Sequence, residues 1–99
     1  MPSFSLKFTH TANRQRQQLE SDNSQEKRLK AVRKTLGLIQ QDPRYPSLNT
    51  HEYITMRGAN GEKVFESYAE NKTPAAFRIF WHYGPNRGEI TIIAITPHP

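Results

Sequence analysis

One arginine interrupts a stretch of aromatic and aliphatic residues near the end of the chain. Arg78 lies within residues 77–83, where every other side chain is aromatic, aliphatic or histidine. A guanidinium keeps its proton in proteins and binds phosphate oxygens through a planar fork of N–H donors. Because a charge in an apolar strand is costly without a purpose or a partner, Arg78 is the leading candidate for a phosphate-binding cation. The structural alternative is an ion pair with Glu66 or Glu89.

The chain has four histidines, and imidazole can donate or accept a proton near neutral pH. His98 lies in the tail after the last apolar run and His51 follows a loop, so both are candidates for acid–base chemistry. As a residue next to the chain end, His98 could instead be disordered. His82 is interpreted as a core or surface residue and His10 as a residue at a helix start. No two histidines have the spacing of metal ligands, so we expect no metal site.

The predicted sheet brings these candidates within reach of one another. If the turn at residues 84–88 contains one bulge, Arg78 pairs with Ala94. His98 then lies on the same face as Ala94 and four residues further on, about 13 Å away at roughly 3.3 Å per residue. Two long side chains at that separation could meet on one phosphate. Glu66, in another predicted strand, is a candidate carboxylate base or a solvated strand residue.

The charge of the chain is uneven. Fourteen Lys and Arg against nine Asp and Glu give a net charge of +5. Residues 1–50 hold nine basic and four acidic residues, whereas residues 51–99 hold five of each. Such a basic region suits a polyanion, most simply nucleic acid, or serves as a solvated face. The candidate nucleic-acid-binding residues are Lys27, Lys30, Arg33 and Lys34, with Arg14, Arg16 and Arg28 nearby.

Composition excludes several classes of protein. At 99 residues we expect one domain spanning 1–99, too small for a two-domain enzyme with a buried cofactor. The absence of cysteine excludes a disulfide scaffold and a Cys-ligated zinc site. No apolar run approaches the ~20 residues of a membrane-spanning helix, and the N-terminus lacks the features of a signal peptide. We therefore expect a soluble, cytoplasmic protein that has no membrane association.

Two helices are predicted in the first half. The polar stretch 11–22 predicts a thin amphipathic helix. The second helix is better defined, because Leu29, Val32, Leu36 and Ile39 recur at helical spacing and form one apolar stripe. Asn23 followed by Glu26 matches a capping box at its start, and the Asp-Pro pair at 42–43 ends it.

Strands surround these helices. Alternation over residues 4–9 predicts a half-buried strand, and 43–62 is interpreted as a loop or a loop with one short strand. From residue 63 the side-chain pattern repeats every two residues, which predicts strands at 63–69, 76–83 and 89–96. The last two are apolar nearly throughout and are placed in the middle of the sheet. The order β-α-α-β-β-β predicts an α+β fold in which a two-helix hairpin packs on one face of an antiparallel sheet.

Three passages resemble one known family. Residues 38–43 (Leu-Ile-Gln-Gln-Asp-Pro) end a basic helix, 77–83 form an aromatic-Arg-aliphatic strand, and 92–99 (Ile-Ile-Ala-Ile-Thr-Pro-His-Pro) form a closing strand with a short tail. Together with the element order and the length, they resemble the RelE/ParE toxin superfamily of bacterial toxin–antitoxin systems. RelE-like toxins are ribosome-dependent endoribonucleases that cut mRNA. ParE-like toxins poison DNA gyrase and are not nucleases. An antitoxin neutralises both.

The RelE-like resemblance implies a metal-free endoribonuclease, an mRNA interferase without a cofactor. Its partners would be a cognate antitoxin, mRNA and ribosomal RNA. Arg78 would stabilise the phosphorane, His98 would be the general acid, and His51 or Glu66 would be the base. The basic residues of the second helix would bind ribosomal RNA phosphates.

Two other functions remain open. The tail lacks the Lys/Arg cluster that strongly active RelE-like toxins often carry after the last strand. That absence favours a ParE-like or degenerate toxin that binds gyrase or another protein without catalysis. A further possibility is an inactive relative that only binds an antitoxin.

Overall fold

A computed structural model describes residues 3–73 and 75–98 of the chain. In order, its helices and strands are β1 (Ser5–Phe8), α1 (His10–Glu20), α2 (Glu26–Gln41), β2 (His51–Arg57), β3 (Lys63–Tyr68), β4 (Phe77–Tyr83) and β5 (Glu89–Pro97). Single 3₁₀ turns at Asn23–Gln25 and Pro46–Leu48 precede α2 and β2 respectively. The expected α+β class is confirmed, and the helices and strands given bounds in the sequence differ from the observed ones by at most two residues at their ends. The expected order β-α-α-β-β-β lacks one strand, because residues 43–62, interpreted as a loop or a loop with one short strand, contain the seven-residue β2.

The strands form one sheet in the order β1-β5-β4-β3-β2. The pairs among β2, β3, β4 and β5 are antiparallel, as expected. The edge strand β1 differs, because it runs parallel to β5 from the Ser5–Glu89 pair onward. The sheet is therefore mixed. Its central strand is β4 and β5 lies next to it, which confirms the prediction that the two most apolar strands are interior.

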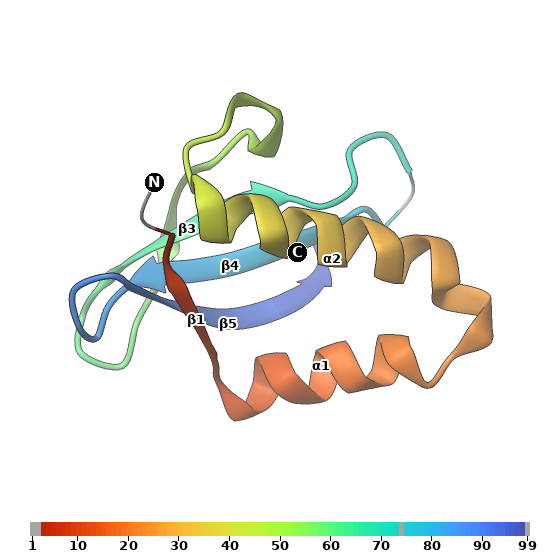
Figure 1. Cartoon of the computed structure of the whole chain (residues 1–99), viewed down its shortest axis with the longest axis horizontal. Coiled ribbons are helices and arrows are strands. Elements are labelled where there is room, and N and C mark those ends of the chain that lie inside the picture. Colours follow the sequence, from red (N-terminus) through yellow and green to blue (C-terminus); the bar gives the residue numbers. More distant parts are fainter. Residues whose placement is uncertain (1–2, 74, 99) are drawn as a thin grey trace.

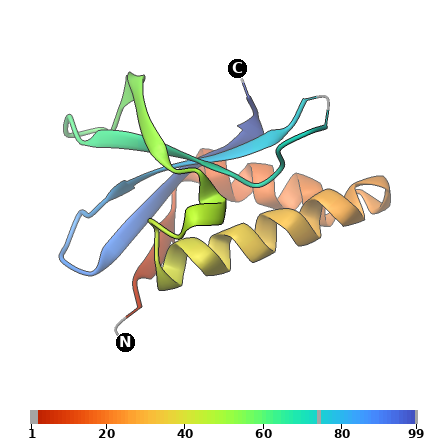
Figure 2. The same cartoon turned by 90° about the horizontal axis from the view of Figure 1, so that it is seen from above.

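Both helices cover the same face of the sheet (Figures 1 and 2). The predicted stripe of α2 is buried there, together with Ile79, Ile92 and the fully buried Trp81. Arg78, near the start of β4, and His98, directly after β5, are thus held on a packed scaffold. In the described part of the chain, neither helix combines the length and the apolar run needed to cross a bilayer.

The hydrogen bonds at the start of each helix show which residues cap its N-terminus. Thr9 caps α1, its hydroxyl accepting from the Ala12 N–H at 3.1 Å, and His10 is the first helical residue, as expected. The predicted capping box at α2 is wrong. Asp22 accepts from the Ser24 N–H, Asn23 enters a 3₁₀ turn, and α2 begins at Glu26 without a side-chain cap. Asp and Asn are equally good cap residues, so the pattern placed the cap one residue late.

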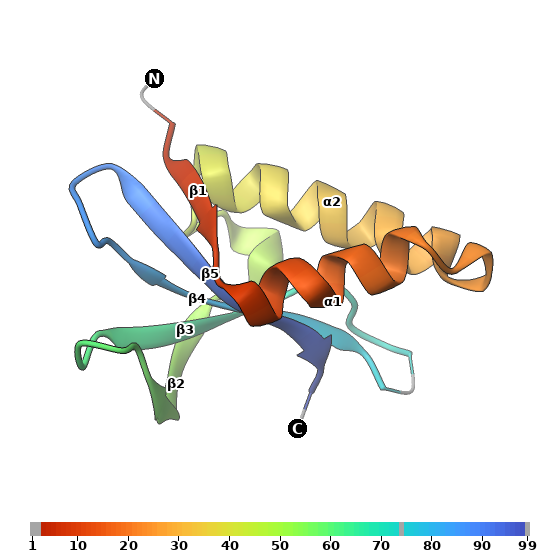
Figure 3. The ribbon, with the colours of Figure 1, turned by 90° about the horizontal axis from the view of Figure 1, so that it is seen from below.

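The helix-free side of the sheet is partly closed by β2. This edge strand is seven residues long and bends toward that side, with the Tyr53 ring 5.0 Å from the Phe80 ring (Figures 2 and 3). The end of β5 also leads away from the helices (Figure 3). Both β2 and the end of β5 therefore extend toward the helix-free side of the sheet (Figure 3).

Candidate functional site

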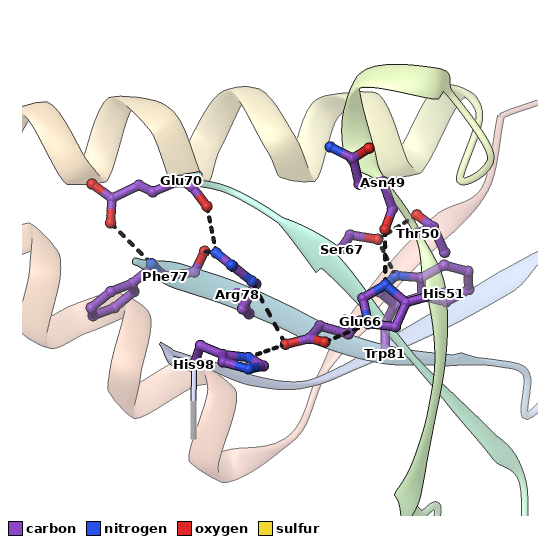
Figure 4. Close-up of polar contacts among 10 residues, drawn as sticks. All are labelled: Asn49, Thr50, His51, Glu66, Ser67, Glu70, Phe77, Arg78, Trp81 and His98. Carbon is purple, nitrogen blue, oxygen red and sulfur yellow. Dashed lines mark hydrogen bonds and ion pairs between the residues drawn. The ribbon is translucent and has the colours of Figure 1, made fainter. Parts of the chain in front are cut away.

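A buried carboxylate lies at the centre of a group of polar side chains. Glu66 on β3 is 1% exposed. One carboxylate oxygen, Oε2, lies 2.7 Å from Nδ1 of His98 and 3.7 Å from Nε of Arg78. The other, Oε1, lies 2.7 Å from Nε2 of His51 (Figure 4). The four residues singled out for catalysis in the sequence thus converge on one point, and their roles remain predictions.

Strand pairing explains how residues so far apart in the chain meet. His51 is the partner of Glu66 across the β2–β3 pair. Arg78 lies opposite Tyr68 of β3 on one side and Thr96 of β5 on the other. The His98 N–H then donates to the Ala76 carbonyl at 2.9 Å, which extends the β4–β5 ladder to the tail.

The predicted register between β4 and β5 is wrong by two residues. Arg78 pairs with Thr96 rather than Ala94. The register shifts between Phe80, which pairs with Ala94, and Trp81, which pairs with Ile92. The extra residue on β5 is a β-bulge, which bends a strand and redirects its side chains. As a result His98 lies two residues beyond the partner of Arg78, about 7 Å along the strand at roughly 3.3 Å per residue.

The guanidinium of Arg78 is held from several directions. Its Nη1 donates to the Glu70 carbonyl and, at 3.3 Å, to the Phe77 carbonyl. The Tyr68 ring lies over it, with 3.7 Å between the guanidinium carbon and the ring centroid. The residue is 7% exposed. Of its two predicted ion-pair partners, Glu66 is the one beside it, whereas Glu89 contacts Lys7.

Two buried polar atoms in this cluster lack a hydrogen-bond partner among the described residues. They are Oε1 of Glu66 and Nε of Arg78. His51 Nε2 approaches Oε1 closely, but the contact does not have the geometry of a hydrogen bond. An unsatisfied buried polar atom costs about 1–3 kcal/mol, more if charged. Such atoms are rare, and a catalytic role or a bound water or ion can account for them. Nε of Arg16 on α1, outside the cluster, is a third such atom.

The two histidines flank the carboxylate and face outward. Their side chains are 48% exposed for His51 and 49% for His98. An ionised carboxylate only accepts, so Nδ1 of His98 donates to Glu66. Nε2 of His98 has no hydrogen bond with any residue that the structure describes. Nδ1 of His51 instead lies 3.0 Å from the Asn49 carbonyl and donates to it. Within residues 3–73 and 75–98, no three His, Asp or Glu side chains are arranged to hold a metal ion.

A hydrogen-bonded chain that the sequence did not reveal fixes the start of β2. The buried Trp81 indole N–H donates to the Ser67 hydroxyl at 2.8 Å, and the Ser67 and Thr50 hydroxyls are 2.7 Å apart. Thr50 also donates to the Pro43 carbonyl. This chain ties the residue before His51 to the core. A lone Ser in a strand carries no sequence signal of such a role.

The remaining candidates lie outside the cluster. Lys27, Lys30, Arg33 and Lys34 are all exposed on α2. Arg33 lies 3.5 Å from Glu20 of α1, and Arg28 pairs with Glu70 at 2.8 Å. His82 is buried and contacts the Tyr83 carbonyl, which confirms its interpretation as a core residue.

Three solved structures share this architecture. A YoeB/ParE toxin from Agrobacterium tumefaciens superposes with a TM-score of 0.71 at 8% identity, over 97% of this chain and 100% of that one. The chain has the RelE/ParE toxin fold. A RelE–RelB complex from Pyrococcus horikoshii gives a TM-score of 0.65 at 10% identity over 98% and 96% of the two chains. A YoeB dimer from Staphylococcus aureus gives 0.61 at 13% identity over 97% and 98%.

At these identities the RelE/ParE likeness is one of fold. The sequence has no significant match to a protein-family model or to a curated protein. Function must therefore be argued from the cluster around Glu66.

Proposed function

We propose that this chain is a toxin of a toxin–antitoxin system and acts as a metal-free endoribonuclease on ribosome-bound mRNA. The observation that carries the proposal is the cluster of a buried carboxylate, an arginine and two outward-facing histidines. These groups match the needs of RNA transesterification. A base takes the proton of the 2′-hydroxyl, a cation stabilises the phosphorane, and an acid protonates the leaving 5′-oxygen.

His98 is the acid in this proposal. Its Nδ1–H donates to Glu66, and this contact holds the ring with Nε2 facing outward. A carboxylate behind an imidazole fixes the ring and stabilises its protonated form, as in acid–base triads. The proton on Nε2 passes to the 5′-oxygen as the P–O5′ bond breaks.

Glu66 is the base. Its Oε1 has no directed hydrogen bond and can accept the 2′-hydroxyl proton as the 2′-oxygen attacks phosphorus. The products are a 2′,3′-cyclic phosphate and a 5′-hydroxyl. His51 suits the role of base less well, because one of its nitrogens donates to Asn49 and the other faces the carboxylate. Since His51 covers Oε1 and is half exposed, it would move aside when RNA binds.

Arg78 supplies the positive charge. Its Nε has no hydrogen-bond partner among the described residues and lies 3.7 Å from Oε2 of Glu66. A phosphate oxygen would satisfy this donor beside the base. Because Nη1 and the Tyr68 stack already fix the guanidinium, little reorganisation is needed when charge develops on the phosphorane.

The partners follow from the same proposal. One structural neighbour is a RelE–RelB complex, which supports an antitoxin as partner for this chain. The exposed lysines of α2 suit ribosomal RNA phosphates. A chain that acts on translating ribosomes would work in the cytoplasm.

Cleavage in a translation mixture of purified components tests the proposal. Reporter mRNA is translated with the wild-type chain, and cuts are mapped by primer extension. The wild type is expected to cut translated mRNA and Arg78→Ala to leave it intact. Arg57→Ala is the matched control, because Arg57 is an exposed arginine of β2 whose side chain lies 3.9 Å from Glu52, away from the cluster. Intact mRNA with the wild type, or equal cleavage by Arg78→Ala, contradicts the proposal.

A second candidate is a ParE-like toxin that binds DNA gyrase. The observation in its favour is the burial of Arg78, whose contacts with Glu66, Glu70 and Tyr68 also suit a structural ion pair. It predicts inhibition of supercoiling by purified gyrase with mRNA left intact, and Arg78→Ala should then act only by destabilising the fold.

A further inference from the structure

A hollow beside the catalytic cluster is open on the surface between α2 and the end of β3. Its volume is about 270 Å³, and its lining includes Lys34 and Leu38 of α2, Ser47 and Leu48 before β2, and Tyr68. Tyr68 connects it to the cluster, because the same side chain stacks on Arg78 and meets the edge of the His51 ring at 5.9 Å. The hollow therefore adjoins the proposed scissile phosphate.

Two lysines border this surface. Lys27 and Lys34 are seven residues apart on α2, which places them on the same helix face, about 10 Å apart at roughly 1.5 Å per residue. Lys34 lines the hollow beside Tyr68, and Lys27 lines a second one of about 210 Å³ beside Glu70. We call this surface the α2 groove, defined by Lys27, Ala31, Lys34, Tyr68 and Ala69.

Lys30, three residues from Lys27 and four from Lys34, is exposed on the same face of α2. The two arginines Arg33 and Arg28 are placed differently. Arg33 lies on the flank that faces α1, where its Nη2 is 3.5 Å from Glu20. Arg28 is engaged inside the molecule, paired with Glu70 and stacked on Phe77. The basic residues of α2 therefore do not form one uniform surface, and two of the lysines lead along the helix toward the cluster.

We propose that the α2 groove binds the RNA strand next to the scissile phosphate, with one nucleobase in the hollow beside Tyr68 and with Lys27 and Lys34 on phosphates. This inference rests on the proposed function and names the subsite for its substrate. The lining suits a base, since it combines aliphatic side chains and an aromatic ring with hydroxyl groups, and it includes no carboxylate. Aromatic rings and lysines along a groove are the usual means of holding single-stranded RNA.

Binding can be measured apart from cleavage with a short 2′-O-methyl oligoribonucleotide, which lacks the attacking hydroxyl. Fluorescence anisotropy over a range of salt concentrations gives Kd and the salt slope. Lys34→Ala should weaken binding about five- to ten-fold at low salt and reduce the log–log slope by ~0.7, the value of one single-strand phosphate contact. Lys27→Ala should do the same.

Lys63→Ala is the matched control, because it removes one positive charge from an exposed lysine at the opposite end of β3 from Tyr68. It should change Kd less than two-fold and leave the slope nearly unchanged, on the order of 0.1. Ala31→Leu fills the groove with a good helix former and should weaken binding several-fold without changing the helical circular dichroism.

The inference is overturned if Lys63→Ala weakens binding as much as Lys34→Ala, or if Ala31→Leu binds as the wild type does. Cleavage of unmodified mRNA is scored separately. A wild type that binds the oligonucleotide through the groove but cuts no mRNA contradicts the proposed function and supports the groove. A wild type that cuts mRNA while the groove variants bind normally supports the proposed function and contradicts the groove.

Discussion

The Nδ1 atom of His98 lies 2.7 Å from Oε2 of Glu66, although 32 residues separate them in the chain. The contact depends on the bulge in β5, which brings the tail one residue closer to Arg78, and on the hydrogen bond from the His98 N–H to Ala76. A residue next to the chain end is thus held in place by the sheet. This placement gives the tail histidine a defined geometry for proton transfer.

The two histidines should respond differently to removal. His98→Ala removes the proposed acid and should lower the cleavage rate by about 100-fold or more. His51→Ala uncovers Oε1 of Glu66 and should change the rate by less than about ten-fold. Single-turnover cleavage in the translation mixture measures both, and a larger loss from His51→Ala than from His98→Ala would show that His51 is the base.

Arg78→Lys keeps the positive charge but removes the planar fork. It should lower the cleavage rate by about 100-fold, the usual effect of losing one donor that stabilises a transition state. Arg57→Lys, the same change on an exposed residue, should have no effect. Equal cleavage rates for Arg78→Lys and the wild type would mean that the positive charge is sufficient and that the planar fork is not required.

Ser67→Ala tests the hydrogen-bonded chain behind β2. It leaves the buried Trp81 indole N–H without an acceptor, which should lower the free energy of unfolding by about 1–3 kcal/mol. Urea denaturation followed by tryptophan fluorescence measures the loss. Ser47→Ala, at an exposed serine, should change the free energy of unfolding by less than about 0.5 kcal/mol. Similar losses for the two variants would show that the hydrogen bonds of Ser67 do not stabilise the fold.

Asp22 contributes stability that depends on pH. Hydrogen bonds from the Ser24 hydroxyl and then from its backbone N–H lower the pKa of this carboxyl below its ordinary value. The contribution is present above that ordinary value and is lost as the pH falls through the lowered one. Asp22→Ala should therefore reduce Tm at neutral pH and have less effect at a pH of about 2. A difference of the same size at both pH values would contradict this.

Much of the candidate site followed from residue type alone. Arg78 is conspicuous because a charge in an apolar strand requires a partner, and Glu66 was one of the two carboxylates weighed for it. His51 and His98 were singled out by their chemistry and position in the chain. Local patterns also located the helices and the two central strands, because apolar residues recur at a regular spacing in each of these elements.

What could not be predicted depends on contacts between distant segments. The bulge between Phe80 and Trp81 has no sequence mark, and it changed the register that decides how close His98 comes to Arg78. The parallel pairing of β1 with β5 follows from how the whole chain folds back. Arg28 was counted among the basic residues near the nucleic-acid-binding set, and its ion pair with Glu70, 42 residues away, could not be predicted from the sequence.

The end groups of the RNA products, compared between the wild type and Glu66→Gln, test the central claim most directly. Glutamine preserves the size of the side chain but cannot take a proton from the 2′-hydroxyl. The account predicts that the wild type leaves a 2′,3′-cyclic phosphate and a 5′-hydroxyl, and that Glu66→Gln cuts about 100-fold more slowly while binding the 2′-O-methyl oligoribonucleotide normally. Products with a 5′-phosphate, or undiminished cleavage by a folded Glu66→Gln variant, would contradict it.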